Sequence, residues 1–159
     1  MTTGSQDPLQ ATTPTNIGSA TTPVATASPV TCIQLLPSNS GRPIPAPCQA
    51  EVWCVNFNPT TGAEIRKVRP AVVLNNSGAG KLPLRIVIPI TEWSPSFTKA
   101  PWLVQVSPTA TNGLSKDSAA DTFQVRSVSV DRFVNKIGDL TASDMDLIRA
   151  ALDFCVEEE

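Results

Sequence analysis

The stretch that decides the fold is Asn58-Pro-Thr-Thr-Gly-Ala-Glu-Ile-Arg-Lys-Val-Arg-Pro-Ala-Val-Val-Leu74. It begins with turn-forming residues, Asn58 to Gly62, and ends in a continuous apolar run, Ala71 to Leu74, which is typical of a buried strand. Between them lies a polar loop with one acid and three cations: Glu64, Arg66, Lys67 and Arg69. The sequence therefore predicts a charged loop that leads directly into a strand of the core.

Arg69 stands at the junction of this loop and the strand. Pro70 fixes the backbone there, and it biases the residue before it toward extended geometry. A guanidinium held at a strand end is a rigid fork of donors that suits a phosphate group. The alternative is a surface cation that only caps the strand, and the residue type alone leaves both interpretations open.

Further strands are expected on both sides of this stretch. Residues Glu51 to Phe57 place Trp53, Val55 and Phe57 on one face, which is the period-two signature of a strand. Apolar runs predict other strands at residues 71–74, 84–90, 102–106 and 123–128. Because no helical pattern separates them, they favour an antiparallel barrel or meander over alternating strand–helix units.

The C-terminal segment has a different, helical pattern. Thr141 and Asp144 supply a capping hydroxyl and an early acid. Apolar side chains then recur at helical spacing, at Met145, Ile148, Leu152 and Cys155. The predicted fold class is therefore mainly β (α+β): a small antiparallel barrel with one amphipathic C-terminal helix of about fifteen residues packed against it.

The composition divides the chain in two. Residues 1–46 contain 21 Ser, Thr or Pro and no aromatic residue, so they cannot bury enough apolar surface to offset the entropy of ordering. We predict a disordered Ser/Thr/Pro-rich leader over 1–46 and one barrel domain over 47–159. No apolar run is long enough for a membrane span, and no basic start precedes an apolar block, so we expect a cytoplasmic protein without membrane contact.

The residue inventory limits the chemistry. The chain has no histidine, which excludes Ser-His-Asp, Cys-His and paired-His mechanisms. Its four cysteines include no CxxC pair, so neither a metal site nor a cofactor is predicted. Residues 50–136 carry ten Lys or Arg against six Asp or Glu, and residues 137–159 carry one against seven. A basic body with an acidic end fits an anionic ligand on one face.

The quoted stretch resembles the first-loop signature of the MazF/PemK toxins, D-P-x-x-G-x-E followed by a polar spacer and R-P-A-V-V-L. The matching positions are Pro59, Gly62, Glu64, Arg69 and Pro70, with the apolar run behind them. Residues Ile88 to Thr91 are similar to the motif that closes the family's third strand, and Gln124 to Val128 to its fifth-strand segment. The resemblance extends over about two-thirds of the chain, roughly from Glu51 to Val156.

The resemblance implies an SH3-like barrel that works as a homodimer and is blocked by a cognate antitoxin with a disordered acidic tail. It implies the toxin component of a type II toxin–antitoxin system, an mRNA interferase that cleaves single-stranded RNA. By position, Arg69 and Thr91 are the catalytic pair and Glu64 assists them. RNA cleavage by attack of the 2′-hydroxyl needs neither histidine nor metal if cations neutralise the charge on the phosphorus oxygens.

Four further residues are candidates for RNA binding. Arg66 and Lys67 are either a solvated loop face or a phosphate-attracting one. Trp93 follows Thr91 in a proline-bounded loop, where it could stack on a base. Arg126 is either a cation of the barrel wall or a second RNA contact. Trp102, in contrast, is predicted as strand core.

Five positions depart from the family pattern. Gln49 and Ala50 stand where the family usually has a basic residue and Gly before its first strand. Asn56 and Asn58 stand where the family has aspartates, and Phe123 stands where some members have an acid. These departures leave a second function open: the same fold acting as a non-catalytic binding protein, or as a decayed toxin that binds an antitoxin or another protein.

Overall fold

The computed structural model describes residues 46–76, 78–79 and 82–157. Its strands are β1 (Glu51–Asn56), β2 (Val68–Val73), β3 (Leu84–Glu92), β4 (Leu103–Val106), β5 (Ser118–Asp121), β6 (Arg126–Ser129) and β7 (Phe133–Asp139). Short 3-10 helices follow three of them, namely η2 (Pro95–Lys99), η3 (Thr122–Gln124) and η4 (Val130–Arg132), and α1 (Ala142–Val156) ends the domain. Apart from Ala46, the predicted leader lies outside the described residues.

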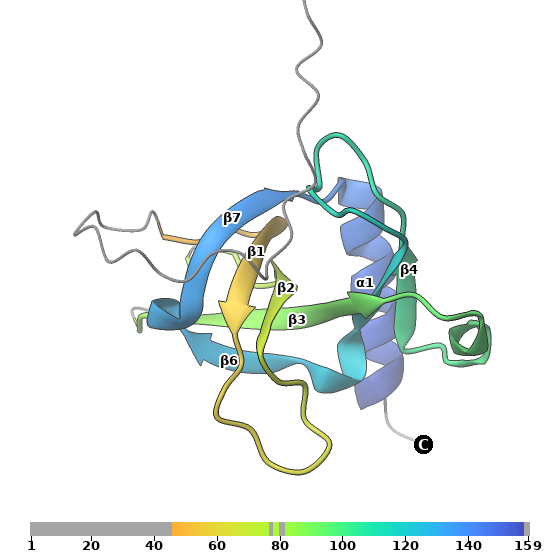
Figure 1. The fold of residues 1–159 in the computed structure, drawn as a ribbon, viewed down its shortest axis with the longest axis horizontal. Coiled ribbons are helices and arrows are strands. Elements are labelled where there is room, and N and C mark those ends of the chain that lie inside the picture. The colour runs from red at the N-terminus through yellow and green to blue at the C-terminus, as the bar shows by residue number, and fades with distance from the viewer. Residues whose placement is uncertain (1–45, 77, 80–81, 158–159) are drawn as a thin grey trace, which may run out of the picture.

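The strands form one curved antiparallel sheet in the order β4-β5-β3-β2-β1-β7. The long strand β3 is its centre, since it pairs with β2 on one edge and with both β6 and β5, in succession, on the other. Figure 1 shows β3 crossing the middle of the molecule, with α1 against one end of the sheet. The predicted mainly β fold with a single C-terminal helix is confirmed.

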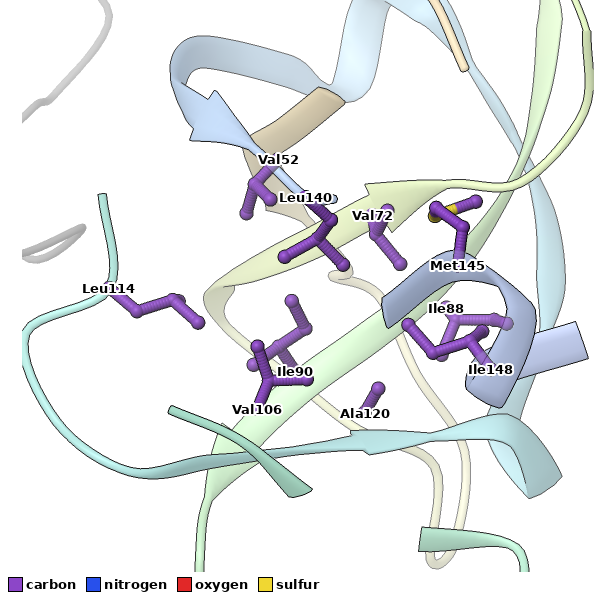
Figure 2. Close-up of a cluster of buried hydrophobic side chains, with 10 residues drawn as sticks. All are labelled: Val52, Val72, Ile88, Ile90, Val106, Leu114, Ala120, Leu140, Met145 and Ile148. Atoms are coloured by element: carbon purple, nitrogen blue, oxygen red, sulfur yellow. The ribbon is translucent and has the colours of Figure 1, made fainter. Parts of the chain in front are cut away.

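Two hydrophobic clusters hold this sheet. One lies between the sheet and α1, where Met145 and Ile148 of the helix face Val72 of β2 and Ile88 of β3 (Figure 2). Burying a side chain of this size stabilises a fold by roughly 1.5–3 kcal/mol. The other cluster contains Trp53, Val55 and Phe57 of the first strand and its continuation, as their alternation predicted, together with residues of β2, β3, β6 and β7: Ala71, Val73, Val87, Val128 and Phe133.

The helix forms as its sequence predicts. Thr141 and Asp144 make a reciprocal capping box, in which the Thr141 hydroxyl accepts from the Asp144 N–H and the Asp144 carboxylate accepts from the Thr141 N–H. This pairing satisfies two of the N–H groups that a helix start leaves without partners. Within the described ranges, no helix is long and apolar enough to cross a membrane.

Several predicted boundaries are wrong. β2 begins at Val68, so Arg69 lies inside the strand rather than at its junction with the loop. The predicted strand 123–128 is divided into η3 and β6, and Trp102 lies just outside β4 and is 38% exposed rather than core. β5 and β7 were not predicted, because Ser118-Ala-Ala-Asp121 and Phe133-Val-Asn-Lys-Ile-Gly-Asp139 have weak apolar alternation.

Candidate active site

Arg69 and Thr91 lie on neighbouring strands. The ladder between β2 and β3 ends at the pair Ala71–Pro89. Arg69 and Thr91 lie two residues beyond that last pair on their strands, at positions of the same parity as Ala71 and Pro89. Residues opposite each other in an antiparallel pair share one face of the sheet. The fold therefore directs the two predicted catalytic side chains to the same face at the end of the β2–β3 ladder.

The surroundings of the pair differ between the two residues. Arg69 is exposed and lies across from buried Val55 on β1, so its guanidinium extends from the rim of the second cluster. Thr91 is half-buried and lies across from the fully buried Ala119 on β5. A cation that reaches solvent beside a sheltered hydroxyl is an arrangement that can bind one phosphate group from two sides.

The loop with Glu64 connects β1 to β2, and Figure 1 shows it as the yellow excursion below β3, on the side of β6. Two contacts join its tip to the segment around η3. The N–H of Ile65 donates to Gln124 Oε1 at 2.6 Å, and Glu64 Oε2 lies 3.6 Å from Arg126 Nη1. These contacts link residues about sixty positions apart, and they set the position of the loop relative to the barrel.

Gln124 uses both ends of its amide. Its oxygen accepts from Ile65, while its Nε2 donates to Asp121 Oδ2 at 3.0 Å. Asp121 is half-buried, and its second oxygen, Oδ1, is buried without a hydrogen-bond partner. Burial raises the pKa of Asp121 above its usual range, although hydrogen bonds from Gln124 and from backbone N–H groups act in the opposite direction.

Arg126 is fixed from two sides. Its guanidinium carbon lies 5.8 Å from the centre of the Phe57 ring, and its Nη1 forms an ion pair with Glu64 Oε2. A guanidinium over an aromatic ring gains a cation–π attraction and keeps its remaining N–H groups free to donate. Its side chain is 30% exposed, so it stays accessible to an anionic ligand.

A cavity of about 540 Å³ opens between the loop and the segment that follows β5. Its walls come from Thr61, Ala63 and Glu64 on the loop side, and from Phe123, Gln124, Val125 and Arg126 on the other. Glu64 and Arg126 thus belong to one cavity, whereas Arg69 and Thr91 are not among its walls. Within the described residues, no group of His, Cys, Asp or Glu side chains could hold a metal ion.

The other predicted RNA contacts are distributed around the loop. Arg66 and Lys67 are both exposed at its end, where the Lys67 N–H donates to Asn58 Oδ1 and its carbonyl accepts from Phe57. Trp93 is half-buried, and its ring meets that of Phe97 edge-on with centroids 5.9 Å apart. The structure therefore brings Glu64 and Arg126 together. It leaves Arg66 and Lys67 exposed at the end of the loop, and it packs Trp93 against Phe97.

Sequence reasoning missed the part of the site built by Asp121, Phe123 and Gln124. The motif match extended to Gln124, but only Arg126 was given a role. The available signal was the spacing of an acid and an amide three residues apart, which suits a hydrogen bond across one short helical turn. Without knowing that residues 122–124 form such a turn, that spacing carries no meaning.

Comparisons with known proteins identify the family of this chain. The family model of PemK-like, MazF-like toxins of type II toxin–antitoxin systems matches residues 48–156. The chain is 32% identical over 111 residues to Endoribonuclease MazF9 of Mycobacterium tuberculosis, an alignment that covers 65% of this chain and 91% of that protein.

Solved structures share the fold. The crystal structure of MazF from Deinococcus radiodurans has a TM-score of 0.60 at 21% identity, over 71% of this chain and 98% of that one. A mycobacterial endoribonuclease in complex with its cognate antitoxin has a TM-score of 0.56 at 14% identity, over 72% of this chain and 98% of that one. The extent of the family match and the identity to a curated relative together establish that this chain belongs to the PemK/MazF-like toxins of type II toxin–antitoxin systems.

Proposed function

We propose that this chain is an endoribonuclease toxin that cleaves single-stranded RNA without a metal ion, with Arg69 and Thr91 as its catalytic pair and Glu64 as their assistant. The observation that supports the proposal is that Arg69 and Thr91 lie on neighbouring strands, each two residues beyond the last β2–β3 pair, Ala71–Pro89. Family membership and the identity to Endoribonuclease MazF9 support the reaction class.

The proposed reaction is an internal transesterification. The 2′-oxygen of a ribose bonds to the adjacent phosphorus, its proton passes to a base, and the bond from phosphorus to the 5′-oxygen breaks. The leaving 5′-oxygen then takes up a proton. The products are one end with a 2′,3′-cyclic phosphate and one with a 5′-hydroxyl, so the atoms balance without water or an oxidant.

Each residue has one proposed role in this sequence. Arg69 stabilises the negative charge that develops on the phosphorus oxygens and supplies the proton to the leaving oxygen. The Thr91 hydroxyl donates to a non-bridging oxygen, and Glu64 accepts the proton of the 2′-hydroxyl. Fixed donors of this kind often contribute more to catalysis than any other effect, and removing one lowers the rate by roughly 10²–10³-fold.

Arg66, Lys67, Arg126 and Trp93 are proposed to bind the RNA around this centre. The three cations attract the phosphate backbone, and this type of attraction weakens with salt. Trp93 is half-buried against Phe97, so stacking on a base would use the ring face that Phe97 does not cover.

The proposed partners follow from the same site. A cognate antitoxin with an acidic segment would compete with RNA for the cations, and the toxin would act in the cytoplasm as a homodimer. Leu84 and Ile86 support the homodimer, because both are apolar residues of β3 that are about 40% exposed, and exposed apolar residues that lie together often form a protein interface. Light scattering of the purified protein tests the dimer.

The test of the activity is incubation of the purified full chain with a mixed-sequence RNA in EDTA. Cleavage should occur and should fall by about 10²–10³-fold in Arg69→Ala and in Thr91→Ala. Arg149→Ala and Thr98→Ala are matched controls, since both side chains lie on other elements and bond locally. A folded wild-type protein that leaves RNA intact would favour the non-catalytic binding function instead.

A further inference from the structure

Phe123 is an exposed aromatic side chain beside the cavity. It is 74% exposed, and its ring lies 6.2 Å, centre to centre, from that of Trp102, which is itself 38% exposed. Single apolar side chains on a surface need no explanation. An exposed ring that lines a cavity with charged walls and contacts a second aromatic ring is a more specific arrangement, because unstacked bases bind to aromatic surfaces.

The backbone on both sides of Phe123 is fixed. Thr122 is fully buried, and its hydroxyl lies 2.8 Å from the Trp102 carbonyl and 3.3 Å from that of Ala151 on α1. Gln124 is held by Ile65 and Asp121 on the other side. Because both neighbours are anchored, the ring is presented to solvent from a rigid turn, and binding on it loses little conformational entropy.

The walls of the cavity suit a nucleobase. Phe123, Val125 and Ala63 are apolar, while Glu64 offers acceptor oxygens and Arg126 offers donor N–H groups on one side. Base edges carry both acceptors and donors, so a carboxylate and a guanidinium together can read them. A volume of about 540 Å³ lies within the roughly 300–1,000 Å³ common for small-ligand sites.

We infer that the cavity between the β1–β2 loop and η3 binds one nucleobase of the RNA, with Phe123 as its stacking platform and Glu64 and Arg126 at its edge. This inference rests on the proposed function, since it assigns the base subsite of the same enzyme. It makes Phe123 a specificity-determining residue. It also assigns a function to a phenylalanine at a position where some family members have an acidic residue.

The test measures binding separately from chemistry. A fluorescent single-stranded RNA of mixed sequence, methylated at every 2′-oxygen, lacks the attacking hydroxyl proton and cannot be cleaved. We expect Phe123→Ala to weaken its binding by roughly 5- to 150-fold, the range found when a stacking aromatic is truncated. Phe123→Tyr should retain wild-type affinity, whereas Phe123→Leu, which is apolar but cannot stack, should behave like Phe123→Ala.

Phe154→Ala is the matched control. Phe154 is a 54% exposed phenylalanine on α1 that does not line the cavity, so its removal should leave RNA binding unchanged. A second readout uses RNA that contains 2-aminopurine, whose fluorescence falls on stacking. Quenching should occur with the wild type and be lost in Phe123→Ala.

The outcomes separate the two proposals. Binding that is equal in Phe123→Ala and wild type, or equal in Phe123→Leu and wild type, overturns the stacking role and leaves the cleavage proposal standing. Binding that depends on Phe123 in a protein that cleaves no RNA supports the base site and overturns the cleavage proposal. Absence of RNA binding by the wild type overturns both.

Discussion

Replacement of Gln124 by glutamate tests whether this side chain holds the β1–β2 loop, which contains Glu64. Gln124→Glu keeps an acceptor for the Ile65 N–H, but it turns the group that donates to Asp121 into a second carboxylate. A hydrogen bond at 3.0 Å thereby becomes a contact between two negative charges inside a partly buried turn.

The expected loss in the free energy of unfolding has two parts. Losing the hydrogen bond costs about 1 kcal/mol. Two unit charges about 4 Å apart repel by about 4 kcal/mol at an effective dielectric constant near 20, and we take half of this because both side chains are partly exposed. The sum is about 3 kcal/mol, which corresponds to roughly 12 °C in the midpoint of thermal unfolding for a domain of about 110 residues.

The loss of stability in Gln124→Glu should depend on pH. Burial raises the pKa of Asp121, so the native protein keeps this proton to a higher pH than the unfolded chain does, and stability falls as pH rises from 3.8 through the raised value. A second carboxylate nearby strengthens this effect. The deficit of Gln124→Glu should therefore be largest at pH 7 and should shrink as the pH approaches 4.

A compensating change provides the control. In the double variant Asp121→Asn with Gln124→Glu, the new amide can donate to the new carboxylate, whose other oxygen still accepts from Ile65. Thermal unfolding followed by circular dichroism should show most of the lost stability restored, and RNA cleavage should recover with it. A Gln124→Glu protein as stable as the wild type at pH 7, or a double variant no better than the single one, would refute the reasoning.

Other predictions concern two carboxylates, Glu64 and Glu51, and two glycines. The Glu64–Arg126 ion pair is 3.6 Å long and partly exposed, so Glu64→Gln should lower the free energy of unfolding by no more than about 0.5 kcal/mol, measured by urea unfolding. The initial rate of RNA cleavage should fall by a larger factor than this small loss of stability explains. Gly113→Ala should destabilise by more than about 3 kcal/mol, because φ is +67° and the new Cβ would lie 2.0 Å from the Ile137 carbonyl oxygen. Gly62→Ala, at φ +61° in open space, should cost only about 1 kcal/mol. For Glu51, burial raises the pKa, but hydrogen bonds from the Cys48 N–H, Lys136 and Trp53 outweigh it, so the pKa is lowered. Glu51→Gln should thus reduce the unfolding midpoint at pH 7, and the difference should vanish as pH falls below 4.5 through that lowered value.

The parts of the fold that the sequence predicted well are those with strong local patterns. The alternation of Trp53, Val55 and Phe57 predicted one of the two buried faces of β1 and its continuation, and Thr141 with Asp144 predicted the start of α1. β7 was missed because its backbone pairs with β1 through two register shifts, and its side chains alternate poorly. Its place in the sheet comes from long-range pairing, which local apolar alternation does not reveal.

In the candidate site, too, residues within a local motif could be predicted, and features that depend on long-range contacts could not. Arg69, Thr91 and Glu64 could be proposed from the sequence because a contiguous motif and a strand end contain them. The cavity was not found, because Glu64 and Phe123 are far apart in sequence and meet only when the loop docks on η3. The turn at Thr122–Gln124 also depends on a buried hydroxyl bonded to the backbone beside β4 and on α1, a contact that no local pattern encodes.

The most direct test of the central claim is the chemistry of the cleaved ends. Purified protein is incubated with a single-stranded RNA in EDTA, and the termini of the products are identified by mass spectrometry. If Arg69 and Thr91 promote attack by the 2′-hydroxyl, the products carry a 2′,3′-cyclic phosphate and a 5′-hydroxyl, and the amount of both falls by about 10²–10³-fold in Arg69→Ala and in Thr91→Ala. Products with a 5′-phosphate, or cleavage at the wild-type rate in both variants, would contradict the account.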